Sequence, residues 1–258
     1  MASVSNFVSK DKGLFKGSIY AFIPKHAVVP LVQDDEKDTE LEILVEPGET
    51  VSEGQLIARK GEALIHSSIP GRVEQIENCQ YPDGMQGKAA TIAFSGAFTY
   101  TGKKLAEKSW ADRTPQDLSS HFAELGVVNT FSGCKPLSSQ IDRLPPEKDR
   151  LLVVRLFDDD PSRALENYLV LKEQEKVTGG IVFIAQAMAA KGIVAVYAKK
   201  QAPLPLDQVT ALDGTSIPVL TIKTDASRYP SGSSRDIALA VKKQTKEAPW
   251  SAIRSEEH

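Results

Sequence analysis

Side chains that could do chemistry lie at two places in the second half of the chain. Three aspartates, Asp158 to Asp160, follow an apolar stretch of strand length. They could hold a cation or a ribose hydroxyl, but we prefer a helix cap, because the helix dipole favours acidic residues at a helix start. The segment "YPSG", Tyr229 to Gly232, follows a second apolar stretch. It could clamp a ligand at the carboxyl end of a sheet, or it could be a plain turn.

The cysteines and histidines do not predict a metal site. Cys79 and Cys134 are the only cysteines and form no C-x-x-C pattern, which excludes a cysteine-ligated iron–sulfur cluster or zinc ribbon within this chain alone. The four histidines are scattered, without an i, i+4 pair. We interpret His66 as structural, because the sequence shows no carboxylate that would converge on it, and Cys134 as a small buried residue rather than a reactive thiolate.

Length, composition and charge limit the class of protein. The chain has 258 residues, 41% hydrophobic and 25% charged, with a net charge of −3, which suits two modest domains. Its basic residues form no stripe, so nucleic acid is not an expected partner. No apolar run approaches the roughly 20 residues that cross a bilayer, and the stretch "MASVSNFVSKDKGLFKGS" lacks the apolar central region of a secretory signal. We therefore expect a cytoplasmic protein with no transmembrane segment of its own.

The first half predicts an all-β domain at residues 25–100, after an N-terminal segment, 1–24. Short β-branched runs such as "AVVPLV", "LEILV", "QLIAR" and "AATIAF" alternate with Gly, Pro, Asn and Asp. Gly48, Gly54 and Gly71 are expected in turns where a side chain would clash or φ must be positive.

The second half predicts an α/β domain at residues 114–245, followed by a polar tail, 246–258. "TPQDLSSHFAELG" predicts a helix from Thr114 to Gly126, and a helix after the aspartates is expected to end at Gly179–Gly180. "RLLVVRLF", "GIVAVYA" and "IPVLTIK" predict buried parallel strands, and "IVFIAQAMAAKG" suits either a helix or a strand. Alternating strands and helices predict a three-layer, Rossmann-like fold.

The glycine pattern of the first domain resembles that of biotinyl and lipoyl carriers, which share the barrel-sandwich hybrid fold. The stretch "EPGETVSEGQLIA…HSSIPGRVEQIE" carries their G-x-x-V-x-x-G-Q and later G-x-V elements. Carriers present a modifiable lysine on a hairpin. Here the corresponding segment is "RKGEALI", in which Lys60 lacks the Met-Lys-Met setting. We therefore interpret the domain as a structural barrel, with a carrier role for Lys60 as an alternative.

Over residues 14–242 the order of motifs resembles the RnfC protein of the Rnf electron-transport complex. "IPKHAVVPLVQ", the glycine pattern, "YPDGMQGKAATIAFSG" and "KTDASRYPSGSSRDIA" match its successive segments. The resemblance implies a second domain akin to the flavoprotein subunit of complex I. The chain is also similar to the NqrA protein of the sodium-pumping NADH:quinone reductase, which has a Gly-poor loop and a "D-T-N-P" turn like "DDDP" here.

The resemblance implies a flavin and nucleotide site that this chain has partly lost. Relatives carry a glycine-rich loop where this chain reads "GVVNTFSGCKPLSSQ", with only Gly126 and Gly133 remaining. The other degenerate cofactor-binding positions are Asp158, Tyr229 and Gly232.

Our leading hypothesis is a scaffold subunit of an electron-transport complex, without a redox cofactor of its own. It implies peripheral attachment to the inner face of the cell membrane, with membrane subunits as partners. The alternative is an active flavoprotein subunit that binds FMN and oxidises NADH.

Overall fold

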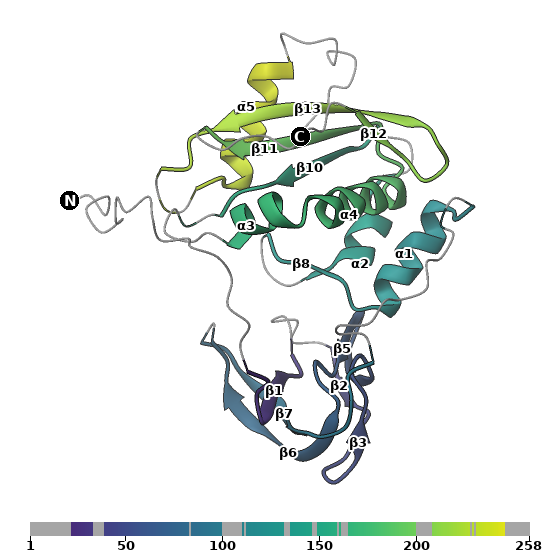
Figure 1. The fold of residues 1–258 in the computed structure, drawn as a ribbon, viewed down its shortest axis with the longest axis vertical. Helices are drawn as coiled ribbons and strands as arrows, with labels where there is room; N and C mark the ends of the chain where they lie inside the picture. The colour runs from purple at the N-terminus through teal and green to yellow at the C-terminus, as the bar shows by residue number, and fades with distance from the viewer. Residues whose placement is uncertain are drawn as a thin grey trace, which may run out of the picture. The chain divides into compact units, whose positions relative to one another are not determined.

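The structure is a computed structural model (Figure 1). It describes residues 22–32, 39–82, 84–99, 110, 112–131, 135–145, 149–158, 160, 165–199, 208–227, 229 and 231–245. Gly133, Cys134, Asp159 and the predicted tail lie outside these residues, as does nearly all of the predicted N-terminal segment.

The described residues form two compact units. The barrel unit holds residues 22–99 together with 116–144, and the sheet unit holds residues 110–115 and 145–245, with the gaps given above. Residues 116–144 thus group with the barrel. Whether the two expected domains, residues 25–100 and 114–245, fold independently of each other stays a prediction.

The barrel is built from two antiparallel sheets. One has the strand order β1-β7-β6-β3 and the other the order β2-β4-β5. Their strands are β1 (His26–Pro30), β2 (Leu41–Ile43), β3 (Thr50–Val51), β4 (Leu56–Lys60), β5 (Ala63–His66), β6 (Gly71–Gln80) and β7 (Gln86–Phe94). The short β-branched runs of the sequence therefore form the predicted strands.

The inward-facing side chains of both sheets make one apolar core. Val73 lies opposite Ile92 on β6 and β7, and both are fully buried. Ile57 and Ile65 reach the same core from the other sheet. Because successive side chains of a strand point to opposite faces, this pattern leaves polar residues such as Arg72 outside.

Two glycines of the barrel are needed for different reasons. Gly54 has φ +75° in the turn before β4, as predicted. Gly71 is not in a turn: it begins β6 with φ outside the left-handed region, so the predicted turn is wrong there. A Cβ at Gly71 would run into the Ala93 carbonyl oxygen and lie 2.8 Å from Ile92 Cγ2. Crowding by the neighbouring strand therefore requires this glycine.

Two helices and two short strands complete the barrel unit. α1 (Pro115–Glu124) begins at the predicted position, and β8 (Val128–Asn129) pairs with β9 (Lys135–Pro136) before α2 (Leu137–Asp142). The Ser119 hydroxyl donates to Asp142 Oδ1 (2.9 Å), which ties α1 to α2.

The sheet unit has a mixed four-stranded sheet with the order β10-β11-β13-β12. β10, β11 and β13 are parallel, whereas β12 runs antiparallel to β13, so the expected all-parallel sheet is corrected to a mixed one. The elements are β10 (Leu151–Arg155), α3 (Leu165–Lys172), α4 (Gln174–Ala187), β11 (Gly192–Ala198), β12 (Gln208–Thr210), β13 (Ser216–Thr224) and α5 (Ser234–Thr245).

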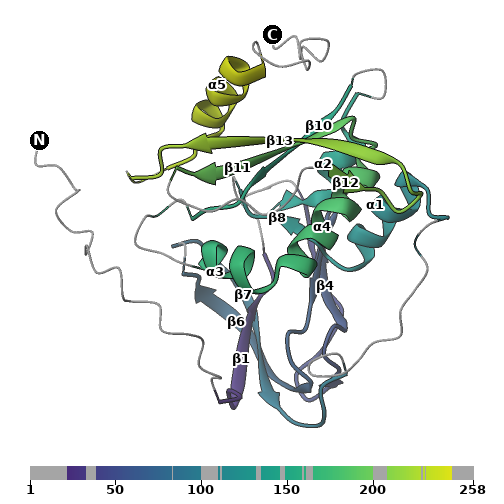
Figure 2. The ribbon, with the colours of Figure 1, turned by 45° about the horizontal axis from the view of Figure 1, so that its top comes forward.

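Helices cover both faces of this sheet. Figure 2 shows α5 on one side of it and α3 and α4 on the other. Ile193, Ala195 and Tyr197 of β11 are fully buried in a core shared with Ile181 and Ala185 of α4. The central strand is buried on both faces, which explains its nearly continuous apolar sequence.

The helical region between β10 and β11 differs from the prediction. α4 runs through Gly179 and Gly180, where the sequence predicted a helix end, and it includes most of the ambiguous "IVFIAQAMAAKG" stretch. A glycine inside a helix costs about 1 kcal/mol. Burial of Ile181, Ala185 and Ala187 against the sheet offsets that cost, at about 25 cal/mol per Å² of apolar surface.

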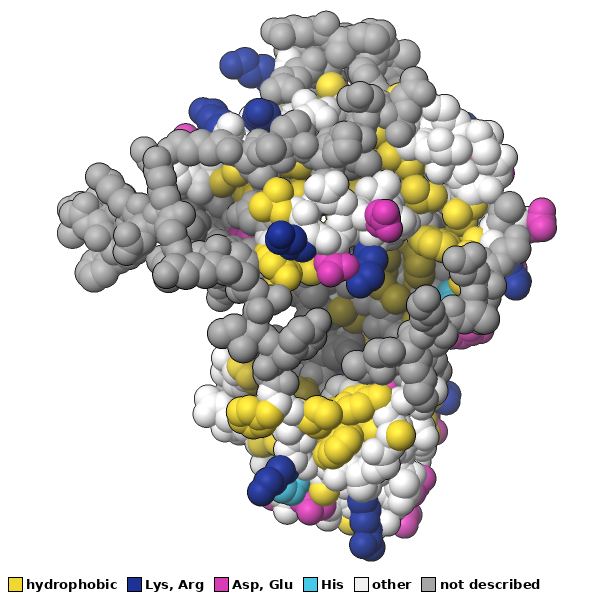
Figure 3. Space-filling model, viewed as in Figure 1, with side chains coloured by type: hydrophobic (Ala, Val, Ile, Leu, Met, Phe, Trp, Pro, Cys, Tyr) yellow, Lys and Arg dark blue, Asp and Glu magenta, His cyan; other side chains and the backbone are white. Residues whose placement is uncertain are grey.

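Apolar side chains also reach the surface of the molecule (Figure 3). On α3, Leu165, Leu169 and Leu171 are 66%, 40% and 57% exposed, whereas Val170 is buried. This short helix therefore presents its leucines to solvent, whereas Val170 belongs to the core of the sheet unit.

Candidate functional site

The candidate site of the sheet unit lies where the parallel strands end. The carboxyl ends of β10 and β13 lie at the same edge of the sheet, because both strands run parallel to β11. The chain that follows β10 contains Asp158, and the chain that follows β13 contains Ser231 and Gly232. We call Arg155, Phe157, Asp158, Glu166, Ser231 and Gly232 the carboxyl-end cluster.

Asp158 holds two segments together within this cluster. It is 6% exposed. Its Oδ1 accepts a hydrogen bond from the Glu166 backbone N–H at the start of α3 (3.3 Å), and its carbonyl oxygen accepts one from the Ser231 hydroxyl (3.4 Å). A carboxylate that binds a backbone N–H in the first turn caps the helix. The preferred capping interpretation of the aspartates therefore holds for Asp158, which bonds to the first turn of α3 from outside the helix.

Phe157 fills the space beside Gly232. The ring is 1% exposed, and a Cβ at Gly232 would lie 2.5 Å from Phe157 Cζ and 3.2 Å from Arg155 Cδ. The Arg155 guanidinium carbon lies 5.9 Å from the centre of the ring, within the range of a cation–π contact. Arg155 Nη2 also lies 3.9 Å from Glu166 Oε1. Gly232 has φ +67°, so both its backbone and its neighbours favour glycine.

The structure brings together only some of the predicted site residues. The Ser231 hydroxyl donates to the Asp158 carbonyl oxygen, which brings Gly232, the next residue, close to Asp158. Tyr229 is 67% exposed on the adjoining loop. Gly126 belongs to the barrel unit, and Gly133 lies outside the described residues.

Three members of the cluster were not predicted from the sequence: Arg155, Phe157 and Glu166. The only signal for Arg155 and Phe157 was their position, two residues apart at the end of an apolar strand. Glu166 gave no signal, because its place beside Asp158 depends on where α3 begins.

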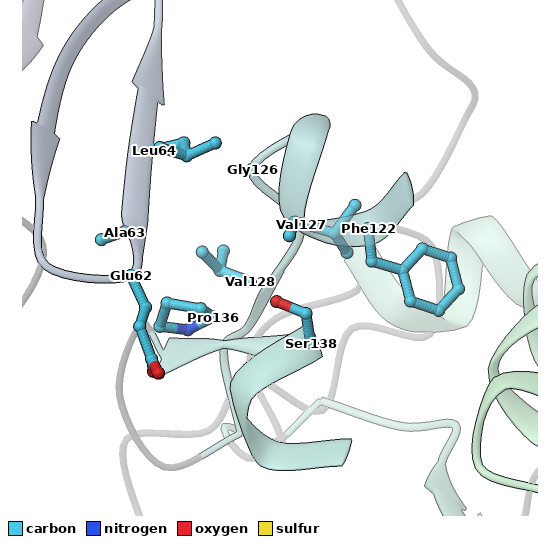
Figure 4. A pocket seen from close by; sticks show the side chains of 10 residues that line it. Glu62, Ala63, Leu64, Phe122, Gly126, Val127, Val128, Pro136 and Ser138 are labelled. Carbon is cyan, nitrogen blue, oxygen red and sulfur yellow. The ribbon is translucent and has the colours of Figure 1, made fainter. Parts of the chain in front are cut away.

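Gly126 lies in the turn after α1, against the β4–β5 hairpin. Its φ is +62°, and its backbone N–H donates to the Ala123 carbonyl oxygen (3.0 Å). A Cβ at this position would lie 2.7 Å from the Leu64 carbonyl oxygen and 2.8 Å from His66 Nδ1. A shallow depression adjoins this contact and is lined by both segments (Figure 4).

Neither glycine lines an open cradle for a phosphate. A phosphate-binding glycine lets a ligand approach its backbone on the side that lacks a Cβ. At Gly126 that side faces Leu64 and His66, and at Gly232 it faces Phe157. The residues at these two positions do not fit a flavin phosphate.

The described part of the chain holds no clustered metal ligands. There, no group of three or more His, Cys, Asp or Glu side chains is arranged to hold a metal ion. Among the same residues, no helix is long and apolar enough to cross a membrane.

Comparison with known proteins identifies the barrel. No curated protein matches the chain. The family model of the RnfC barrel sandwich hybrid domain matches residues 12–97, which include all seven barrel strands. This match confirms the resemblance of the N-terminal motifs to RnfC, and it shows that this part of the chain is a barrel-sandwich hybrid domain of the RnfC type.

Proposed function

We propose that this chain is an RnfC-like component of an Rnf-type electron-transport complex, in which it acts as a scaffold with a degenerate nucleotide site. The match of residues 12–97 to the RnfC barrel domain carries this proposal. The proposed partners are membrane subunits of the complex, which would hold the chain on the inner face of the cell membrane. The order of motifs in the sequence also resembles that of the NqrA protein of the sodium-pumping reductase, and this resemblance points to the same class of assembly.

The second unit supports a relationship to nucleotide-binding folds. Three parallel strands with helices on both faces resemble a Rossmann-like domain, and the antiparallel β12 is a common addition at the edge of such sheets. On this proposal Gly126, Gly133, Asp158, Tyr229 and Gly232 are remnants of cofactor positions.

The closed carboxyl-end cluster favours a scaffold over an active flavoenzyme. In open α/β sheets, ligands bind in the crevice beyond the carboxyl ends of the strands. Here Phe157, Asp158 and Ser231 are each less than 7% exposed at that edge. A ligand would have to displace side chains that pack against one another.

Membership of a complex is tested by purification from native membranes. We expect the tagged full-length chain, extracted with a mild detergent, to co-purify with multi-span membrane subunits in a fixed ratio. A matched preparation of a tagged unrelated soluble protein controls for carry-over of membrane. Recovery of the chain alone, in the soluble fraction and at every salt concentration tried, would contradict the proposal.

The scaffold role predicts that the purified chain is colourless and that excess FMN leaves its melting temperature unchanged. A ligand at about 100 times its Kd stabilises a protein by about 2.7 kcal/mol, which shifts Tm by several degrees. A flavodoxin stripped of FMN, measured beside it, shows that the added flavin is competent. A yellow preparation, or FMN-dependent NADH oxidation, would support the flavoenzyme alternative instead.

A further inference from the structure

We propose that residues 116–131 and 135–144, which we call the clasp, are the partner of the β4–β5 hairpin of the barrel. The hairpin is thus an internal docking surface rather than an exposed arm. This inference goes beyond the proposed function and does not depend on it, because it rests on contacts within the barrel unit.

The hairpin has two faces, and the core covers only one of them. Ala63 and Ile65 are 4% and 3% exposed, and Ile65 belongs to the barrel core. Leu64 and His66 alternate with them and therefore point to the other face, where they are half-buried. The atoms that approach this second face include the Gly126 backbone of the clasp.

The approach of Gly126 is closer than any other residue type would permit. Its missing Cβ would lie 2.7 Å from the Leu64 carbonyl oxygen and 3.0 Å from His66 Cε1. The turn is held in place by α1, since the Val127 N–H donates to the Phe122 carbonyl oxygen (2.9 Å). Phe122 is itself buried. The helix end therefore presents a bare backbone to the hairpin.

The clasp makes a second contact at the tip of the hairpin. Arg143 Nη2, just after α2, lies 3.2 Å from Glu62 Oε2 in the β4–β5 turn. Both side chains are more than half exposed, so this ion pair adds little stability. It mainly shows which part of the clasp lies beside the tip of the hairpin. Glu62, Ala63 and Leu64 line one side of the depression in Figure 4, opposite Val127, Val128 and Pro136.

The clasp is braced internally, so the two contacts act together. The Leu137 N–H donates to the Val127 carbonyl oxygen (2.9 Å), and Asn129 Nδ2 donates to Gln140 Oε1 (2.9 Å). These bonds connect the Gly126 turn to α2, and hence to Arg143. In carrier proteins of similar fold, the corresponding hairpin presents a lysine. Here Lys60 ends β4 next to a turn that contacts the clasp.

The test is hydrogen–deuterium exchange on the full-length chain with alanine or valine at Gly126. We expect Gly126→Ala to raise amide exchange about tenfold in both residues 62–66 and the clasp, while β6 and β7 stay protected. Gly126→Val should have the same pattern with a larger effect. The matched control is Gly84→Ala, because Gly84 also has a positive φ (+89°) but a Cβ there meets nothing within 4 Å. It should leave both segments unchanged.

Three results would overturn the inference. In the first, the clasp loosens while residues 62–66 keep their protection, so the hairpin does not need it. In the second, neither segment changes. In the third, Gly126→Ala opens β6 and β7 as much as the hairpin, which would make the clasp part of the general core.

Discussion

Replacing Gly71 by valine is expected to destabilise the barrel by about 3 kcal/mol or more, at the upper end of single substitutions. The new Cβ would run into the carbonyl oxygen of Ala93 on the neighbouring strand and crowd Ile92. A rotamer change cannot relieve this collision, because the Cβ position is set by the backbone. β6 and β7 would have to separate where Gly71 faces Phe94.

The change in the free energy of unfolding is measured in two ways, by amide hydrogen exchange and by urea denaturation monitored with circular dichroism. Gly84→Val is the matched control in the same unit, since it introduces valine at positive φ in open space and should cost only about 1–2 kcal/mol. Both tryptophans of the chain, Trp110 and Trp250, lie outside residues 22–99, so their fluorescence does not report the barrel strands. Equal stability of Gly71→Val and Gly84→Val would mean that the strands do not approach so closely.

Gly232→Val is expected to destabilise the sheet unit by about 3 kcal/mol, which distinguishes a packing role from a ligand-binding role. Valine would lie against the Phe157 ring and Arg155 Cδ, and its backbone would be held at φ +67°. If Gly232 served only a ligand, its replacement would leave the stability of the free protein nearly unchanged.

A double-mutant cycle separates the ring contact from the backbone strain. Gly214→Val, at φ +84° with nothing within 4 Å, gives the cost of the strain alone. Phe157→Ala alone should cost about 3–5 kcal/mol, as for other buried aromatic side chains. The pair Gly232→Val and Phe157→Ala should cost clearly less than the sum, because the alanine makes room for the valine. Strictly additive costs would show that the two residues do not touch.

The barrel strands could be predicted because their signals are local. Alternating β-branched residues and turn residues set each strand, and Gly54 has the expected positive φ. Gly71 was misassigned because its requirement comes from Ala93 and Ile92, more than twenty residues away in the sequence. A sequence pattern does not record how closely another strand approaches.

The sheet unit was predicted less completely for two physical reasons. β12 has only three residues, and the Asp213–Gly214 turn that leads into β13 was not used as a hairpin signal. In α4, tertiary burial outweighed the low helix propensity of Gly179 and Gly180.

The candidate site was predicted only in part. Asp158 and Gly232 were singled out because each follows an apolar strand, and parallel strands bring their ends together. Their contacts with Phe157 and Glu166 depend on side-chain packing between distant segments. No local motif encodes that packing.

The segments of the two units alternate along the sequence, and this order has a consequence for synthesis on the ribosome. When residue 99 has emerged, all seven strands of the barrel are available, but the Gly126 turn that covers Leu64 and His66 is not. Domains fold as units during synthesis, at about 5–20 residues per second. The barrel unit is therefore complete only once residue 144 has left the ribosome, and its hairpin face stays open to chaperones until then.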